Sequence, residues 1–209
     1  MLAVDVHVVD HPLAMSRLTA MRDARTEPGA FRAALHELTT MLVYEATRDF
    51  PVEKSPVQTP VATAEGTRLA HPPLLVPVLR AGLGMLDSIL QLVPHARVGF
   101  IGLKREETTL HAMFYHKSLP ADLGQSEVIL IDPMLATGGS AVAALDLLAD
   151  LDARRVRLVN LVAAPEGIRR VRLHYPKLPI FTAAIDERLN GKGFIVPGLG
   201  DAGDRLFGV

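Results

Sequence analysis

The sequence predicts an α/β fold built around a parallel sheet, and two observations support this prediction. Residues 128–131 are four consecutive aliphatic residues, Val-Ile-Leu-Ile, which is typical of a strand buried on both faces in a parallel sheet covered by helices. Apolar strand-like runs also alternate with helix-like segments between residues 74 and 184, as in βαβ units with right-handed crossovers. A ligand is therefore expected at the carboxyl ends of the strands.

The first third of the chain is expected to be helical and then irregular. An amphipathic helix is predicted behind Thr26, its candidate N-cap, with Pro28 in the first turn. Residues 49–73 contain five prolines among alternating Val and Thr, which predicts irregular edge strands around turns. The buried face of the helix is formed by apolar residues at four-three-four spacing, namely Phe31, Leu35, Leu38 and Leu42.

The alternating part of the chain begins at residue 74. Arg80 follows its first strand and Asp132 its third, so both are expected at the ligand-binding edge of the sheet. The predicted strands are 74–79, 98–103, 128–131, 156–162 and 180–184, and the predicted helices are 84–93, 141–148 and 166–175.

Composition limits the classes of protein that the chain can belong to. With 209 residues, 49% of them hydrophobic, it can form one well-buried domain. Its formal net charge of −1 gives no overall attraction to nucleic acid or to an anionic membrane. The lack of cysteine excludes disulfides and thiolate metal sites, and the eight histidines show no H-E-x-x-H pattern. Without a basic leader or a long apolar run, a cytoplasmic location is expected.

The segment after the central strand is a candidate phosphate site. Asp132 ends the strand, and the loop that follows carries Thr137, Gly138, Gly139 and Ser140 before a helix. Glycines let backbone N–H groups approach an anion, hydroxyls add donors, and the helix presents its positive end. Asp132 suits ribose hydroxyls or the hydration shell of a metal, so the unit favours a sugar phosphate. The alternative is a plain turn in which these residues only cap the helix.

Two basic segments are further candidates, each with a simpler alternative. Arg80 stands beside Gly82 and Gly84 at a strand end, where a guanidinium suits a diphosphate, although a surface Arg in a glycine turn would look the same. Residues 104–108, Lys-Arg-Glu-Glu-Thr, contain Arg105 and would otherwise be a solvated charge run on a hairpin. The known dinucleotide-binding G-x-G-x-x-G and Walker A patterns do not fit the chain.

The run from Asp132 to Ser140 resembles the PRPP (phosphoribosyl diphosphate) motif of type I phosphoribosyltransferases. Most of that superfamily has two adjacent acids, and Pro133 in the second place makes the run similar to that of uracil phosphoribosyltransferases. The resemblance continues from residues 11–13 and 44–49 to residues 197–208. It implies a Rossmann-like parallel sheet in a single domain of residues 1–209, with a core of about 74–185 and a hood formed by 1–73 and 186–209.

The resemblance also implies an activity, in which uracil and PRPP give UMP and diphosphate with Mg²⁺ bound to PRPP, and a homodimer or larger assembly. Arg80, Arg105 and Asp132 would be catalytic. Ile195, Gly200, Asp201 and Ala202 would bind uracil. The metal would have no direct protein ligand and would lie near Asp201 through its waters. The residues that would bind PRPP are Arg80, Arg105, Asp132, Pro133, Met134, Leu135, Ala136, Thr137, Gly138, Gly139, Ser140 and Asp201.

The chain departs from the family pattern in two places, and it leaves alternatives open. Phe194 replaces the usual Tyr before Ile195, and residues 108–116 lack the usual proline of a mobile loop. The glycine-rich run 195–205 is expected to contain no regular structure. A transferase for another nucleobase, or a regulatory nucleotide- or RNA-binding protein on the same fold, are the competing hypotheses. The sequence does not decide whether GTP is an effector.

Overall fold

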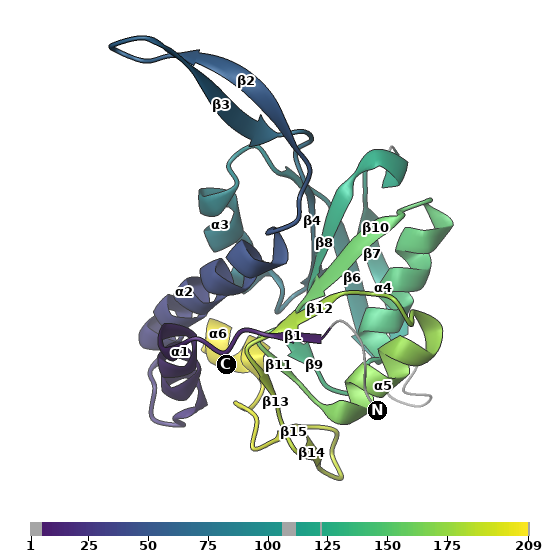
Figure 1. The fold of residues 1–209 in the computed structure, drawn as a ribbon. Helices are drawn as coiled ribbons and strands as arrows, with labels where there is room; N and C mark the ends of the chain where they lie inside the picture. The colour runs from purple at the N-terminus through teal and green to yellow at the C-terminus, as the bar shows by residue number, and fades with distance from the viewer. Residues whose placement is uncertain (1–5, 106–111, 122, 209) are drawn as a thin grey trace.

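The computed structural model describes residues 6–105, 112–121 and 123–208, and its centre is an eight-stranded sheet (Figure 1). Every pair in this sheet is parallel except β6–β7. The predicted α/β class with a mostly parallel sheet is therefore confirmed. In sheet order the strands are β1 (Val6–Val8), β12 (Ile180–Thr182), β10 (Arg155–Val159), β8 (Glu127–Ile131), β4 (Leu74–Leu79), β6 (Phe100–Arg105) and β7 (Ala112–Ser118), with β5 (Arg97–Val98) beside β4.

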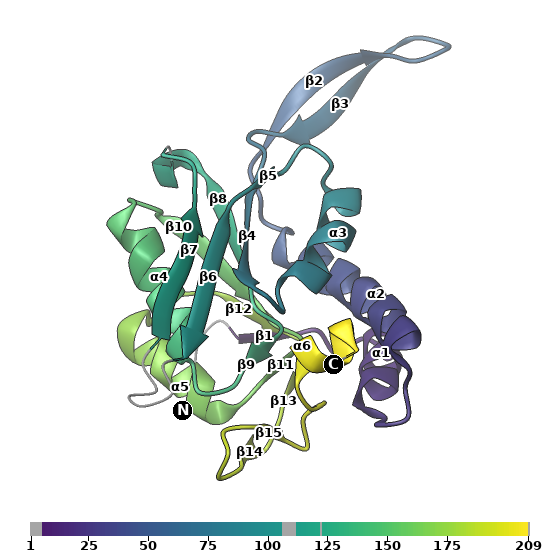
Figure 2. The ribbon, with the colours of Figure 1, turned by 180° about the vertical axis from the view of Figure 1, so that it is seen from behind.

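Helices cover both faces of the sheet, so the central strand β8 contributes to two hydrophobic cores (Figures 1 and 2). Val128 and Leu130 pack with α4 (Gly139–Asp150) and α5 (Pro165–His174). Ile129 and Ile131 face the opposite core, as expected for side chains that alternate along a strand. That second core includes α1 (Pro12–Arg22), α2 (Pro28–Ala46), α3 (Leu83–Leu92) and the C-terminal α6 (Ala202–Phe207).

A smaller parallel sheet lies beyond the carboxyl ends of the main strands. It consists of β9 (Met134–Leu135), β11 (Val162–Ala163) and β13 (Ala184–Ile185). The strands predicted at 156–162 and 180–184 are therefore each divided between the two sheets. A short antiparallel pair, β14 (Arg188–Leu189) and β15 (Ile195–Val196), follows at the same end.

A hairpin of β2 (Val52–Gln58) and β3 (Thr63–Leu69) projects from the body of the molecule (Figures 1 and 2). The prediction of irregular edge strands here was wrong, because the two strands pair regularly along seven residues each. Pro56 fits this ribbon since each strand of a two-stranded pair has one open edge. Nearly every hairpin residue is exposed on both faces.

Two local predictions were also wrong. The N-cap of α2 is Glu27, and the Thr26 hydroxyl instead donates to the Ala20 carbonyl at 2.6 Å, which closes the connection from α1. Residues 195–205 contain β15 and the start of α6, because their left-handed glycines, Gly198 and Gly200, lie between these two elements rather than within them.

The remaining predicted helices are present, and a short 3₁₀ turn at Leu123–Gln125 precedes β8. Pro28 is in the first turn of α2 as predicted. Within the described ranges, no helix is both long and apolar enough to cross a membrane.

Candidate functional site

The phosphate-site candidate lies at the carboxyl end of the main sheet. Asp132 directly follows β8, and its backbone is fixed on both sides because its N–H donates to the Val159 carbonyl at 3.2 Å and its carbonyl accepts from Asn160 Nδ2 at 2.6 Å. The side chain of Asn160 is fully buried. Asp132 itself is only partly buried, and it lines the hollow beside the loop.

The loop after Asp132 has the backbone of an anion cradle. Gly138 is the N-cap of α4 with a left-handed φ of 76°. The Gly139 N–H lies 3.5 Å from Thr137 Oγ1. Residues 132–141 enclose a hollow of about 30 Å³. Because β9 is part of this loop and pairs with β11, a regular sheet fixes the loop. The start of α4 borders this hollow, and the helix dipole favours an anion there, as at known phosphate sites.

A cavity of about 390 Å³ joins this loop to the C-terminal segment. Asp201 is the N-cap of α6, and its Oδ1 accepts from the Asp204 N–H at 3.0 Å. The structure thus brings together two segments that are some 60 residues apart in the chain. Eight of the residues predicted from the sequence line the cavity: Asp132, Met134, Ala136, Ser140, Ile195, Gly200, Asp201 and Ala202.

The other predicted residues lie around this cavity or outside the described chain. Arg80 is exposed in the turn after β4, next to Ala81, which does line the cavity. Arg105 is the last residue of β6, and its side chain and residues 106–111 lie outside the described residues. Residues 112–116 of the expected mobile loop are described and belong to strand β7. The described pairing of β6 with β7 confirms the hairpin that the charge-run alternative assumed. The remaining members, Pro133, Leu135, Thr137, Gly138 and Gly139, belong to the loop itself.

Sequence reasoning missed several residues at this site. Lys192, Gly193 and Gly203 line the cavity, and Asn160 holds the Asp132 backbone. The Asn could have been found as a polar residue that ends the apolar strand Leu158–Val159 at the ligand-binding edge. Lys192 had no such signal, because its segment is near the site only through the β14–β15 turn.

Glu166 supports this turn from the first turn of α5. Its Oε1 accepts from the Leu189 N–H at 3.1 Å, which fixes β14 against the helix. Hydrogen bonds from its own backbone N–H and from Leu189 lower the pKa of the Glu166 carboxyl below its usual value. The carboxylate is therefore ionised near neutral pH and stabilises the start of α5, where the helix dipole favours negative charge.

The cavity offers carboxylate oxygens that suit a hydrated divalent cation. The described residues contain no cluster of three His, Asp or Glu side chains that could hold an ion by themselves. Asp132 and Asp201 nevertheless line the same cavity and offer the hard oxygen atoms that a hydrated Mg²⁺ prefers. A magnesium ion bound to a diphosphate would meet carboxylates here without a dedicated protein cage.

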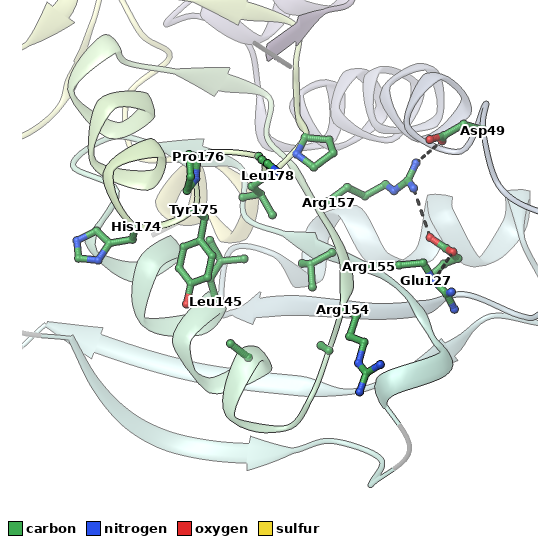
Figure 3. A pocket seen from close by; sticks show the side chains of 15 residues that line it. Asp49, Glu127, Leu145, Arg154, Arg155, Arg157, His174, Tyr175, Pro176 and Leu178 are labelled. Carbon is green, nitrogen blue, oxygen red and sulfur yellow. Dashed lines mark hydrogen bonds and ion pairs between the residues drawn. The ribbon is translucent and has the colours of Figure 1, made fainter.

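A second cavity, of about 600 Å³, lies at the opposite end of the sheet, next to the amino ends of β8 and β10 (Figure 3). Three arginines line it, and all are paired. Arg154 contacts Asp152 at 3.0 Å, Arg155 contacts Glu127 at 2.7 Å, and Arg157 contacts Asp49 at 2.6 Å and Glu127 at 3.4 Å. These pairs neutralise the charge of the three arginines, and Lys177 adds one further positive charge to the cavity lining.

The sheet, with its Asp132 loop and crossover helices, has the fold of solved phosphoribosyltransferases. The solved hypoxanthine phosphoribosyltransferase of Trypanosoma cruzi has the same fold, with a TM-score of 0.51 at 15% identity over 78% of this chain and 76% of that chain. At this identity the likeness concerns the fold alone.

The particular family follows from the sequence. The family model described as uracil phosphoribosyltransferase matches residues 8–209. Proteins with that name from Kineococcus radiotolerans and Corynebacterium diphtheriae are 54% identical over 206 residues (97% of this chain, 98% of the relative) and 52% over 205 (98% and 97%). The solved AQ2163 protein of Aquifex aeolicus has a TM-score of 0.92 at 41% identity and covers 98% of both chains. The chain therefore belongs to the uracil phosphoribosyltransferase family.

Proposed function

We propose that the chain carries out the reaction of its family, the transfer of the 5-phosphoribosyl group of PRPP to uracil with release of diphosphate, in the 390 Å³ cavity. One observation supports this most strongly. The same cavity is lined by Asp132 and Ser140 of the phosphate loop and by Ile195, Gly200 and Ala202 of the C-terminal segment. A sugar phosphate and a nucleobase could therefore occupy it together, as the reaction requires.

The phosphate loop would bind the 5-phosphate of PRPP. Gly138, Gly139 and the start of α4 supply backbone N–H groups, and Thr137 and Ser140 supply hydroxyls. Asp132 would accept hydrogen bonds from the ribose hydroxyls and balance the positive charge that develops on the ribose as diphosphate departs. Arg80 and Arg105 would stabilise the leaving diphosphate by charge-assisted hydrogen bonds. The other loop residues, from Pro133 to Ala136, would contact the sugar phosphate along its length.

Magnesium bound to PRPP would neutralise charge on the diphosphate. Asp201 would meet that complex through the metal's waters, and its place in the cavity lining supports this role. Since Asp201 Oδ1 caps α6, the same side chain would link substrate binding to the order of this helix.

The C-terminal segment would read uracil through its backbone. Uracil presents an acceptor, a donor and an acceptor along O4, N3–H and O2, so its partner must offer a donor, an acceptor and a donor. The carbonyl of Ile195 and the N–H groups of Gly200 and Ala202 would supply them. Ala202 is the first residue of α6, where the helix itself offers no acceptor for the N–H. This N–H would therefore be available to an oxygen of uracil.

The test is a base panel assayed with PRPP and Mg²⁺, in which UMP and diphosphate formation are measured. Uracil should be used, and cytosine should be used far less, because its reversed edge leaves two mispaired contacts. At about 1–3 kcal/mol for each unsatisfied buried group, the discrimination is roughly 30-fold to 10⁴-fold. Cytosine turnover within about tenfold of uracil would contradict this base site. Turnover of another base alone would favour the competing transferase.

The projecting hairpin supports a homodimer or larger assembly. Val52 and Val57 of β2 are 59% and 49% exposed, and Val61 in the connecting turn is 94% exposed, so the hairpin offers apolar side chains that a partner could cover. A two-stranded hairpin alone is only marginally stable in water, so a second copy that covers it would stabilise it. Sedimentation of the wild type and of a chain with residues 54–67 replaced by a short glycine linker tests this. A monomeric wild type would refute the assembly.

The proposed function also implies a single domain, a cellular location and a candidate effector. Residues 1–209 would form one catalytic unit, in which the core of about 74–185 binds most of PRPP and the hood of 1–73 and 186–209 binds the base and, through Asp201, the metal on PRPP. A cytoplasmic location suits an enzyme that consumes PRPP and yields a nucleotide. GTP is a candidate effector, and initial rates with and without GTP test it. The near-neutral net charge of −1 does not support the RNA-binding alternative. A salt-sensitive RNA affinity without turnover would favour it.

A further inference from the structure

One ion pair between distant parts of the chain holds the backbone of Gly198. Arg22, the last residue of α1, donates to the two carboxylate oxygens of Asp186 at 2.8 and 2.6 Å. Arg22 Nη1 also donates to the Gly198 carbonyl at 2.8 Å, and Asp186 Oδ2 accepts from the Gly198 N–H at 2.8 Å. Both polar groups of the Gly198 backbone are therefore bonded to this pair. We call Arg22, Asp186 and Gly198 the clamp.

The clamp is shielded from solvent. The Asp186 side chain is 5% exposed and that of Arg22 is 25% exposed. Bidentate bonds between a guanidinium and a carboxylate are among the stronger and more directional interactions in proteins, and burial reduces their screening. Removing one partner would leave a buried charge without its counterion. The clamp therefore fixes Gly198 far more firmly than a surface salt bridge would.

The clamp also connects the C-terminal segment to the phosphate loop, residues 132–140, through hydrogen bonds. The Asp186 N–H donates to the Ala163 carbonyl at 2.8 Å, so Asp186 extends the β13–β11 pairing by one residue. Strand β11 pairs on its other side with β9, Met134–Leu135, which belongs to the phosphate loop. Backbone hydrogen bonds and one carboxylate thus connect this loop to Gly198.

Gly198 is in direct contact with the proposed base acceptor. Its φ is 62°, and a Cβ at this position would lie 2.2 Å from the Ile195 carbonyl oxygen. The backbone of Gly198 therefore lies directly against that carbonyl, and a shift of Gly198 would move it. Arg205 provides a second connection between this region and the end of α1. It donates to the Leu199 carbonyl at 2.9 Å and to the carbonyl of Asp23, just after α1, at 2.7 Å.

We propose that Arg22 and Asp186 are positioning residues for the base, which act through Gly198 on the Ile195 carbonyl. This inference rests on the proposed function, because it assumes that Ile195 accepts the N3–H of uracil. Neither Arg22 nor Asp186 is among the residues that line the cavity, so they act on the base without touching it. The clamp sets the distance between the base and the phosphate loop, to which it is tied through β13, β11 and β9.

The test compares kinetic constants for the two substrates separately. Arg22→Met should raise the KM for uracil about tenfold or more, with little change in the KM for PRPP, because the Gly198 carbonyl and the Asp186 carboxylate lose their donor. Gly198→Ala should have the same effect, since its Cβ would displace the Ile195 carbonyl.

A double variant distinguishes an effect on the position of the base from an effect on the stability of the fold. Arg22→Met with Asp186→Asn should recover much of the lost melting temperature, because no unpaired charge stays buried, while the uracil KM remains high.

Arg157→Met is the matched control. Arg157 is likewise buried at 9% exposure and bonded to Asp49 and Glu127, but at the far end of the sheet (Figure 3). It should lower the melting temperature and leave the uracil KM within about twofold. A wild-type uracil KM in Arg22→Met and Gly198→Ala, or equal rises in both KM values, would overturn the clamp alone. No UMP formation by the wild type would overturn the proposed function and the clamp with it.

Discussion

Gly138 gives the sharpest test of the phosphate loop, because its backbone and its surroundings both exclude a side chain. The left-handed conformation at φ 76° costs an L-residue about 1–2 kcal/mol. A Cβ would also lie 2.9 Å from the Gly167 carbonyl oxygen and 3.2 Å from Arg170 Cβ, so the loop must shift by a few tenths of an ångström. We expect Gly138→Ala to lower the free energy of unfolding by about 1–3 kcal/mol.

Two assays measure this change. Thermal unfolding should show a melting temperature lower by about 2–12 °C, from the roughly 2–4 °C per kcal/mol expected for a chain of this length. Kinetics at saturating uracil should show a PRPP KM raised by about tenfold, because the displaced loop also carries the N–H groups proposed for the 5-phosphate, and small misplacements at such a site are costly.

Gly139→Ala is the control on the neighbouring residue. Its nearest neighbours to an added Cβ are Arg170 Nη1 at 3.5 Å and Thr137 Oγ1 at 3.7 Å, which are ordinary contacts, and it begins α4, where Ala is favoured over Gly. The melting temperature should therefore be unchanged or higher. If Gly138→Ala matched Gly139→Ala in both stability and PRPP KM, the reasoning from the left-handed loop would be refuted.

Four further predictions test the site and the pH response. Asp132→Asn should fold normally but lose most of its turnover, as kcat/KM would show, because the charge opposite the ribose is lost while the shape is kept. Thr137→Ala and Ser140→Ala should each weaken PRPP binding by about 1–3 kcal/mol in a titration. EDTA should abolish turnover without changing the melting temperature of the free protein, because the metal enters with PRPP. The pKa of Glu166 is lowered by backbone hydrogen bonds and that of Asp49 by its hydrogen bond to Arg157, so their stabilisation is complete above about pH 5 and is lost as pH falls through the lowered pKa values. Melting curves from about pH 3 to 7 should show this decline, and Glu166→Gln should flatten it.

The parts of the fold that local patterns determine could be predicted from the sequence. The strand at 128–131 is such a part, because four aliphatic residues in a row can only be buried on both faces, and each side chain does enter one of the two cores. The helix with Pro28 in its first turn is another. The N-cap was wrong because Thr26 and Glu27 are neighbours, and tertiary contact with Ala20 decides which of them precedes the helix.

The hairpin and the C-terminal segment show where local patterns mislead. The prolines in 49–73 suggested irregularity, yet a ribbon with open edges tolerates them. The glycines in 195–205 suggested a loop, yet the two with positive φ separate β15 from α6. In both cases the residue types were interpreted correctly as breakers, but their exact positions relative to the elements depend on pairing partners that the local sequence does not contain.

The candidate site was predictable to different degrees on its two sides. Strand order places Asp132 and Arg80 at one edge, so the phosphate loop follows from general rules of parallel sheets. That Asp132 lies in the same cavity as Ile195 and Ala202 could be predicted only from the resemblance to a known family. Nothing in the sequence pairs Arg22 with Asp186, which lie 164 residues apart, because any of the basic residues could have been that partner.

This asymmetry has a consequence for how the two substrates would be recognised. The phosphate loop is one continuous βα unit, so substitutions that affect it should lie within or directly against residues 132–140. The base segment is held instead by side chains from α1, by Asp186 beyond β13 and by Arg205 of α6, all brought together by folding. Base affinity should therefore respond to substitutions far from the base, and especially at the end of α1, while binding of the 5-phosphate by the phosphate loop should not.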